Sequence, residues 1–300
     1  MRHAALALAF AAVLVAGPAP AQQDFSKVEI KSTKLADGLW MLVGSGGNLA
    51  VSAGEDATFL VDDQFAPLVP KIVAAIRELT PRPVRFVVNT HWHFDHTGGN
   101  EALGQAGAVI VAHDNSRLRM STDQLIEFLG MRTKPSPKAA LPVITFSADT
   151  TFHLNGDEIH VAHAPRAHTD GDSIVHFRKA DVVHMGDIYF NGMYPFIDTA
   201  SGGTVDGVIA AAQQVASRAT DATKIIPGHG PLSNKAELEA YREMLSTVSG
   251  RIKAQIREGR KLEEIVASKP TRDYDEKWGK GFIKPDKFVE MIVRNLVLAK

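Results

Sequence analysis

The sequence predicts a mixed α/β fold, and three observations lead to that class. Short runs rich in Val, Ile and Phe, such as residues 84–88, are typical of buried strands. Segments with apolar residues at helical spacing, such as residues 70–79, lie between these runs. Hydrophobic residues make up 45% of the 300-residue chain, which is enough for a sizeable core. Strands and helices that alternate at these lengths indicate layered α/β structure.

The first half of the chain predicts a strand meander with tight turns, followed by alternating strands and helices. Pro81 and Pro83 end the first helix before the next strand begins. We expect strands over residues 39–43, 48–52, 57–61, 84–88 and 108–112, and helices over 70–79, 100–103 and 114–130.

The second half predicts a hairpin and then a mainly helical end. Asn155-Gly156 is a strong hairpin turn signal. The prolines at 135 and 137 favour a loop, which serves either as a lid or as a plain connector. We expect strands over residues 143–146, 150–154, 158–163, 181–187 and 223–227, and helices over 205–216, 235–258, 262–268 and 284–299.

The N-terminus has the pattern of a bacterial export signal. Residues 1–3 form a short basic head, residues 4–17 are apolar, and small residues precede Gln22. The apolar run is shorter than the roughly 20 residues that span a bilayer, which disfavours an uncleaved anchor. We therefore expect a signal peptide over residues 1–21 and a mature periplasmic or secreted domain over residues 22–300.

The composition narrows the class of partner. A net charge of −1 argues against a general nucleic-acid-binding surface, so a small molecule is the expected partner. The chain has no cysteine, which excludes disulfides, thiolate ligands and a cysteine nucleophile. The sequence does not determine the oligomeric state.

Three histidines and an aspartate lie within six positions, directly after the strand at 84–88. His91 and His93 share one side of an extended backbone, whereas the adjacent pair Asp95 and His96 points elsewhere. Two sets of donors suggest two metal ions. Imidazole nitrogen and carboxylate oxygen are the ligands that zinc takes in catalytic sites.

The string His-x-His-x-Asp-His, followed by Thr-Gly-Gly, resembles the signature of the metallo-β-lactamase superfamily, a large group of mostly zinc-dependent hydrolases. The resemblance implies a four-layer αββα sandwich with the metal loops at one edge of two sheets. The ligands that it implies are His91, His93 and His168 for one zinc ion, Asp95, His96 and His229 for the other, and Asp187 linking the two.

The resemblance also implies supporting roles. Asp62 is expected to orient a ligand histidine, although neighbouring Asp63 or an ordinary turn role is an alternative. Asp172 is placed to orient the loop of His168. Tyr189, Tyr194 and Phe196 follow a ligand position, where they either line a substrate pocket or cap the core.

The implied mechanism is attack on a carbonyl carbon by a hydroxide shared between the metals, with Asp95 orienting that hydroxide. Certain zinc β-lactamases use a cysteine where this chain has Asp187. An oxygen ligand makes that second site more tolerant of iron or manganese.

The substrate is the least determined feature. The expected export favours a β-lactamase-like lactam hydrolase by a small margin. Lactone or thioester hydrolysis is the alternative, for two reasons. Asp187 gives an oxygen-rich metal site that resembles those of thioester and lactone hydrolases, and Phe190 stands where a lysine would hold the carboxylate of a lactam substrate. An iron-dependent redox role and a non-catalytic binding role are further hypotheses.

Overall fold

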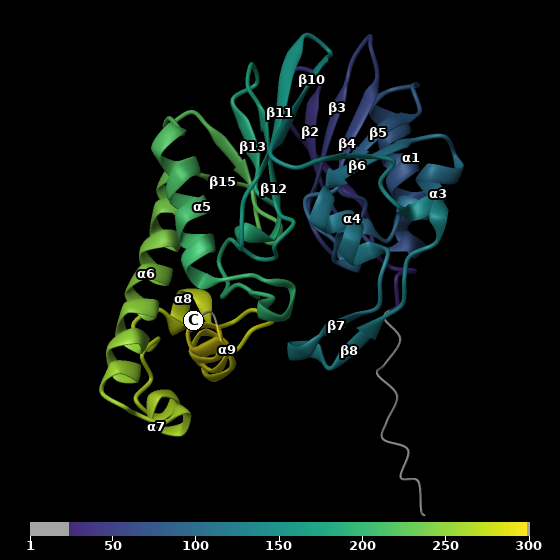
Figure 1. Cartoon of the computed structure of the whole chain (residues 1–300). Coiled ribbons are helices and arrows are strands. Elements are labelled where there is room, and N and C mark those ends of the chain that lie inside the picture. The colour runs from purple at the N-terminus through teal and green to yellow at the C-terminus, as the bar shows by residue number, and fades with distance from the viewer. Residues whose placement is uncertain (1–23, 299–300) are drawn as a thin grey trace, which may run out of the picture.

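The computed structural model describes residues 24–298, in which two β-sheets lie face to face with helices on both outer sides (Figure 1). This arrangement is the αββα sandwich that the family resemblance implies, and it is consistent with the mixed α/β class that the sequence pattern predicts. The expected signal peptide, residues 1–21, lies outside the described residues. Among the described residues, no helix has the length and apolar character needed to cross a membrane.

The first sheet is formed by the N-terminal half of the described chain. Its strand order is β1-β2-β3-β4-β5-β6-β9, and the strands from β4 to β9 run parallel. Its strands are β1 (Lys31–Ala36), β2 (Leu39–Val43), β3 (Leu49–Ala53), β4 (Thr58–Val61), β5 (Val84–Val88), β6 (Val109–His113) and β9 (Ile144–Phe146).

The second sheet follows in the order β10-β11-β12-β13-β14-β15, with one parallel pair, β13 and β14. A separate antiparallel hairpin, β7 (Gln124–Ile126) and β8 (Met131–Thr133), projects from the first half. The strands of the second sheet are β10 (Asp149–Leu154), β11 (Asp157–His163), β12 (Ser173–Phe177), β13 (Val182–His184), β14 (Lys224–Ile226) and β15 (Ser233–Asn234).

The side chains of each strand alternate between two cores. In β4, Phe59 and Val61 point into the core between the sheets, whereas Leu60 points to the outer layer. Ile72 and Ile76 of α1 cover that outer layer. Because both faces are buried, the strand is a continuous apolar run, as parallel strands usually are.

The helices divide between the two outer faces. The short helices of the first half cover the first sheet, while α5, α6 and α9 pack on the second (Figure 1). The helices are α1 (Val69–Leu79), α2 (Phe94–Thr97), α3 (Asn100–Gln105), α4 (Asp114–Met120), α5 (Val205–Arg218), α6 (Lys235–Arg257), α7 (Leu262–Ala267), α8 (Asp275–Trp278) and α9 (Pro285–Leu298). Short 3-10 turns are η1 (Ala66–Leu68), η2 (Glu127–Leu129), η3 (Lys138–Ala140), η4 (Gly186–Ile188) and η5 (Thr199–Ser201).

Most predicted elements match observed ones to within a few residues at each end. The helix expected over residues 114–130 is wrong beyond Met120, where α4 ends and the β7–β8 hairpin follows. The hydroxyls of Ser121 and Thr122 donate to the Leu118 carbonyl at 2.9 and 2.8 Å. These side-chain bonds satisfy a backbone carbonyl of the last turn of α4. They compete with the backbone hydrogen bonds that would continue the helix.

Strand β1 is the longest of several elements that the sequence pattern did not predict, α8 and β15 among them. Its first four residues are exposed, so the apolar alternation that marks a half-buried strand is weak. Pairing with β2 holds it in the sheet instead.

The carboxyl ends of the parallel strands meet at one edge of the sandwich. Strand β4 delivers Asp62 there, β5 delivers the histidine loop, and β13 and β14 deliver Asp187 and His229. His168 precedes β12, which runs antiparallel to β13 and therefore begins at the same edge. The topology thus gathers residues from five separate loops into one place.

Candidate metal centre

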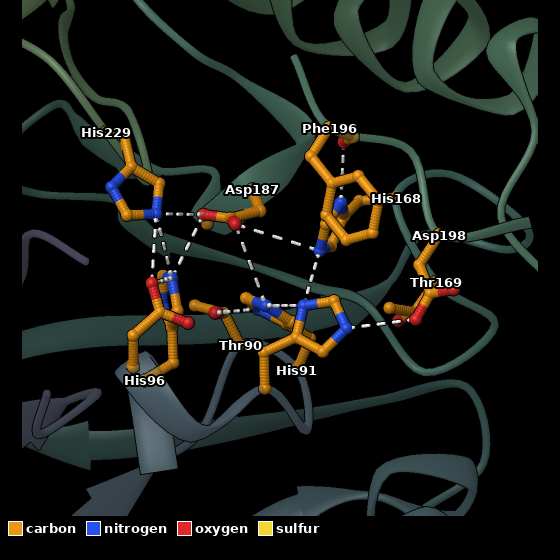
Figure 2. Close-up of polar contacts among 12 residues, drawn as sticks. Thr90, His91, His96, His168, Thr169, Asp187, Phe196, Asp198 and His229 are labelled. Carbon is orange, nitrogen blue, oxygen red and sulfur yellow. Dashed lines mark hydrogen bonds and ion pairs between the residues drawn. The ribbon is translucent and has the colours of Figure 1, made fainter. Parts of the chain in front are cut away.

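The first group of donor atoms consists of three imidazoles and one carboxylate. His93 Nδ1 lies 3.2 Å from His91 Nε2 and 2.9 Å from His168 Nε2 (Figure 2). Oδ2 of Asp187 lies 3.8 Å from His91 Nε2 and 3.7 Å from His168 Nε2. All four side chains are buried.

The second group joins Asp95, His96 and His229. His229 Nε2 lies 3.4 Å from His96 Nε2 and 3.3 Å from Asp95 Oδ2. The side chain of His96 is fully buried, but those of Asp95 and His229 are 21% and 24% exposed. This group therefore forms the side of the centre that solvent reaches.

Asp187 faces both groups, one oxygen to each. While Oδ2 faces the first group, Oδ1 lies 3.0 Å from His96 Nε2 and 3.3 Å from His229 Nε2. Oδ1 is buried and accepts no hydrogen bond of normal geometry. Burial alone would raise the pKa of Asp187, but His229 and His96 outweigh it and hold that pKa well below its ordinary value. The carboxylate is therefore ionised, as a bridging ligand must be.

Both groups fit metal ions by donor chemistry and by spacing. In each group, ring nitrogens of different histidines face one another at close range. They are poorly matched as hydrogen-bond partners, because a neutral imidazole carries only one N–H. Tetrahedral zinc with nitrogen ligands at 2.0–2.1 Å places neighbouring ligand atoms about 3.3 Å apart. The observed separations of 2.9–3.8 Å scatter around that value. The centre is a metal-binding His/Asp cluster.

The far ring nitrogens of the first group are fixed by hydrogen-bond partners. His93 Nε2 lies 3.0 Å from Asp198 Oδ2, and His168 Nδ1 lies 2.9 Å from the Phe196 carbonyl. His91 Nδ1 lies 3.0 Å from the Thr90 hydroxyl. Such partners set the tautomer and the ring orientation of a metal ligand.

Asp62 performs the same task for the second group. Its Oδ2 lies 2.7 Å from His96 Nδ1, and its two oxygens also accept from the amide and the hydroxyl of Thr90 at 2.7 and 2.8 Å. Asp62 has φ of 59°, a strained conformation for a residue with a side chain. Asp63 instead accepts from the Gly99 amide at 2.8 Å, so it supports the loop rather than a ligand ring.

Asp172 holds the backbone of the His168 loop. Its carboxylate accepts from the amides of His168 and Thr169 at 2.6 and 2.8 Å, and from the Thr169 hydroxyl at 2.6 Å. The structure thus places Asp172 against the loop that carries a ligand and not against the ligand ring.

The protonation of the free rings differs between the groups. Burial lowers the pKa of His168 to about 4, so this ring is neutral at pH 7 and can accept a metal. Burial also lowers the pKa of His229, but Asp187 and Asp95 outweigh it and raise that pKa to about 9. A metal entering the second group therefore has to displace a proton.

The three aromatic residues expected near a pocket separate into two kinds. Tyr189 and Tyr194 are fully buried in the core beside the second sheet, where their hydroxyls bond Ser233 and Asp275 at 2.7 and 2.9 Å. They cap the core and line no pocket at the metal centre. Phe196 differs, because its ring stacks on His93 with centroids 5.8 Å apart.

Sequence reasoning missed Asp198. Its carboxylate contacts His93 and, as the N-cap of η5, also accepts from the Ser201 amide at the end of that turn. The Asp-x-x-Ser spacing is a helix-capping signal that the sequence offers, but nothing local indicates that the other oxygen faces a histidine 105 residues away. His113, the last residue of β6, caps α4 and stacks on His163 outside both groups.

Comparison with known proteins decides the family. A model of the metallo-β-lactamase superfamily matches residues 36–229, which include every residue of the two groups. The chain belongs to the metallo-β-lactamase superfamily. Together with the His/Asp cluster, this membership identifies a metal-dependent hydrolase.

Two relatives by sequence carry hydrolase names. A hydroxyacylglutathione hydrolase from Polaromonas sp. is 27% identical over 158 residues, which cover 52% of this chain and 52% of the relative. An acyl-coenzyme A thioesterase from Gallus gallus is 24% identical over 205 residues, which cover 64% of this chain and 71% of the relative. The chain thus spans about half the length of the Polaromonas relative.

Solved structures show the same fold. A metallo-β-lactamase from Pontibacter korlensis matches with a TM-score of 0.60 at 20% identity, covering 73% of this chain and 99% of that chain. The FIM-1 metallo-β-lactamase from Pseudomonas aeruginosa, in its mono-zinc form, matches with a TM-score of 0.58 at 22% identity, covering 73% and 96%. At these identities the likeness establishes the fold alone.

Proposed function

We propose that this chain is a binuclear zinc hydrolase that cleaves a carbonyl compound, with thioesters as the first substrate class. The observation that carries the proposal is Asp187, which presents one carboxylate oxygen to each group of ligands. A carboxylate shared by two metal sites holds them side by side. Such a pair of sites suits a hydrolysis, in which both the attacking oxygen and the oxygen of the carbonyl group carry negative charge that metal ions would stabilise.

The residues have separate tasks in this reaction. His91, His93 and His168 would hold one zinc ion, and Asp95, His96 and His229 the other. Zinc, when bound, supplies a water of lowered pKa and polarises a carbonyl oxygen. Asp95 is partly exposed and can orient that water and hold its proton. Because the chain has no cysteine and the site uses no serine, no covalent acyl-enzyme is needed.

The preference for thioesters rests on the two relatives, both of which are named for thioester substrates. β-Lactams are the second candidate, because the leader-like pattern of residues 1–21 supports export to the periplasm, where β-lactams act. We propose that the mature chain works there or outside the cell on a small molecule.

Metal analysis followed by a substrate panel tests the proposal. We expect the mature protein to hold two zinc ions and to hydrolyse acyl thioesters faster than a chromogenic cephalosporin or a lactone. His168→Ala should abolish hydrolysis, whereas His153→Ala, which changes an exposed histidine of β10, should not. Iron in place of zinc would contradict the zinc assignment, and a metal-loaded protein inactive on the whole panel would contradict the hydrolase proposal.

If the cephalosporin is the better substrate by kcat/KM, the lactam candidate replaces the thioester candidate. The same panel therefore separates the substrate question from the question of whether the centre is hydrolytic.

A further inference from the structure

Two projecting segments near the metal centre expose aromatic side chains. The β7–β8 hairpin carries Phe128 in its tip turn, η2, and the loop before α9 carries Phe282. Phe128 is 37% exposed and Phe282 is 66% exposed, although the neighbouring Ile283 is buried and anchors the loop. Exposed aromatic rings that lie together on the surface are typical of ligand-binding or interaction sites.

These rings form a continuous path to a metal ligand. The Phe282 ring lies 6.5 Å from that of Phe128, and Phe128 lies 5.5 Å from Phe196, both measured between centroids. Phe196 in turn stacks on His93 with an interplanar angle of 25°. Segments from three separate parts of the chain therefore make one aromatic wall beside the centre.

A cavity of about 350 Å³ adjoins this wall. Phe128, Phe196 and Met291 line it, and so does Asp198, whose carboxylate also bonds His93. Its volume falls at the lower end of the range for small-ligand sites, 300–1,000 Å³. The cavity thus begins one side chain away from the metal ligands.

Basic side chains do not outnumber acidic ones around the cavity, because Asp198 adds a third carboxylate to the two glutamates. Glu127 and Glu290 oppose Lys287 and Arg294, and Lys287 already pairs with Glu290 at 2.7 Å. With no excess of positive charge, the cavity offers little to a phosphate or carboxylate group. Apolar side chains are what remains to recognise a ligand there.

Polar contacts hold the hairpin at its base. Arg119 donates to Asp170 at 2.7 Å and to Gln124 at 3.0 Å, and Lys134 pairs with Asp123 at 2.9 Å. A two-stranded hairpin is marginally stable by itself, so contacts at the tip matter for its position. Phe128 at the tip contacts the rings of Phe196 and Phe282, and strand β7 contacts η5. Of these neighbours, Phe196 and η5 border the cavity.

We propose that Phe128, Phe196 and Phe282 bind a bulky apolar acyl group of the substrate, so that the enzyme prefers medium-chain or aryl acyl compounds over acetyl ones. This inference rests on the proposed function, because it assumes that the carbonyl carbon is cleaved at the metal centre. Phe282, and separately the α9 residues that line the cavity, lie beyond residue 229, outside the part that matches the family model, whereas Phe128 and Phe196 lie inside it. The C-terminal segment therefore contributes only part of the proposed acyl site.

The test compares acyl chain lengths in thioesters of one thiol. Zinc-loaded wild type, Phe128→Ala, Phe282→Ala and the double variant are assayed on acetyl, butyryl and octanoyl substrates. We expect the double variant to lose about tenfold or more in kcat/KM for the octanoyl compound, mainly through KM, with little change for the acetyl compound. Phe128→Leu, which stays apolar, should recover much of the octanoyl preference.

Leu118→Ala is the matched control, because Leu118 is an exposed apolar residue of α4 that does not line the cavity. A parallel loss on all substrates, an unchanged chain-length profile, or the same change in Leu118→Ala would each overturn the inference.

A binding measurement separates this inference from the proposed function. Octanoate and acetate, titrated into the zinc-loaded protein, share a carboxylate and differ only in the apolar chain. Tighter binding of octanoate that disappears in the double variant supports the acyl site even if no thioester is cleaved. Equal binding of the two acids overturns the acyl site even if thioesterase activity is present.

Discussion

The two ligand groups share Asp187 but differ in burial and in support. In the first group all three rings are buried, and each far nitrogen has a partner from the protein. In the second, His96 is held by Asp62, but Asp95 and His229 are partly exposed. One site is therefore closed and its rings are held by protein partners, whereas solvent reaches the other.

The same difference extends to charge. In the first group burial lowers the pKa of His91 and of His168, so these two rings are neutral. In the second group Asp187 and Asp95 raise the pKa of His229, which therefore keeps its proton. We therefore expect the first site to bind zinc more tightly and to release it more slowly. Four predictions test this ranking.

The largest effect is expected from removing one ligand of each group. His168→Ala should lose the first zinc ion and lower kcat/KM by about 10³-fold or more, because the pKa of the attacking water returns toward its bulk value. His229→Ala should lose the second zinc ion while keeping the first. Zinc per chain, measured after gel filtration, checks both, and two zinc ions retained in either variant would contradict the ligand assignment.

Asp187→Asn tests the link between the groups. The amide has one oxygen and one NH₂, so it cannot present an anionic oxygen to both sites. We expect weaker zinc binding at both sites and a loss of about 10²-fold or more in kcat, of the size seen when one electrostatic contact to the reacting oxygen is removed. Unchanged zinc stoichiometry and rate would show that Asp187 does not bridge.

A smaller effect is expected from the partners of the ligand rings. Asp198→Asn should weaken zinc at the first site, and Asp62→Asn at the second, each by about 10–100-fold. Competition with a chelator measures the two affinities separately. Asp157→Asn, a change in the β10–β11 hairpin remote from the centre, is the control. The site assignments are wrong if either variant weakens only the opposite site.

The smallest effect concerns pH. The raised pKa of His229, about 9, means that zinc displaces a proton from the second site throughout the range from pH 6 to 8. The apparent affinity of the second site for zinc should therefore rise with pH, by up to about tenfold per pH unit for each proton displaced. His168, with a pKa of about 4, gives no such dependence over this range. Chelator titrations at several pH values test the contrast, and equal slopes at the two sites would remove it.

Much of the fold could be predicted from the sequence because its elements are strongly patterned. The run at 84–88 is a strand and the segment at 70–79 is helical in the structure, since burial on one or both faces leaves a clear apolar period. The pattern failed where burial is incomplete. The exposed strand β1 went unpredicted, and apolar residues of the β7–β8 hairpin imitated a helix.

The sequence by itself determined the donor chemistry: histidines and carboxylates on loops after strands, with no thiolate. Only the tertiary structure decided which residues from distant parts of the chain hold each histidine ring, such as Asp198 at His93. It also decided that Tyr189 and Tyr194 belong to the core. It also placed the hairpin tip against a loop from the C-terminal segment. The physical reason is that donor type and periodicity are local properties, whereas contacts between distant loops depend on how the two sheets pack.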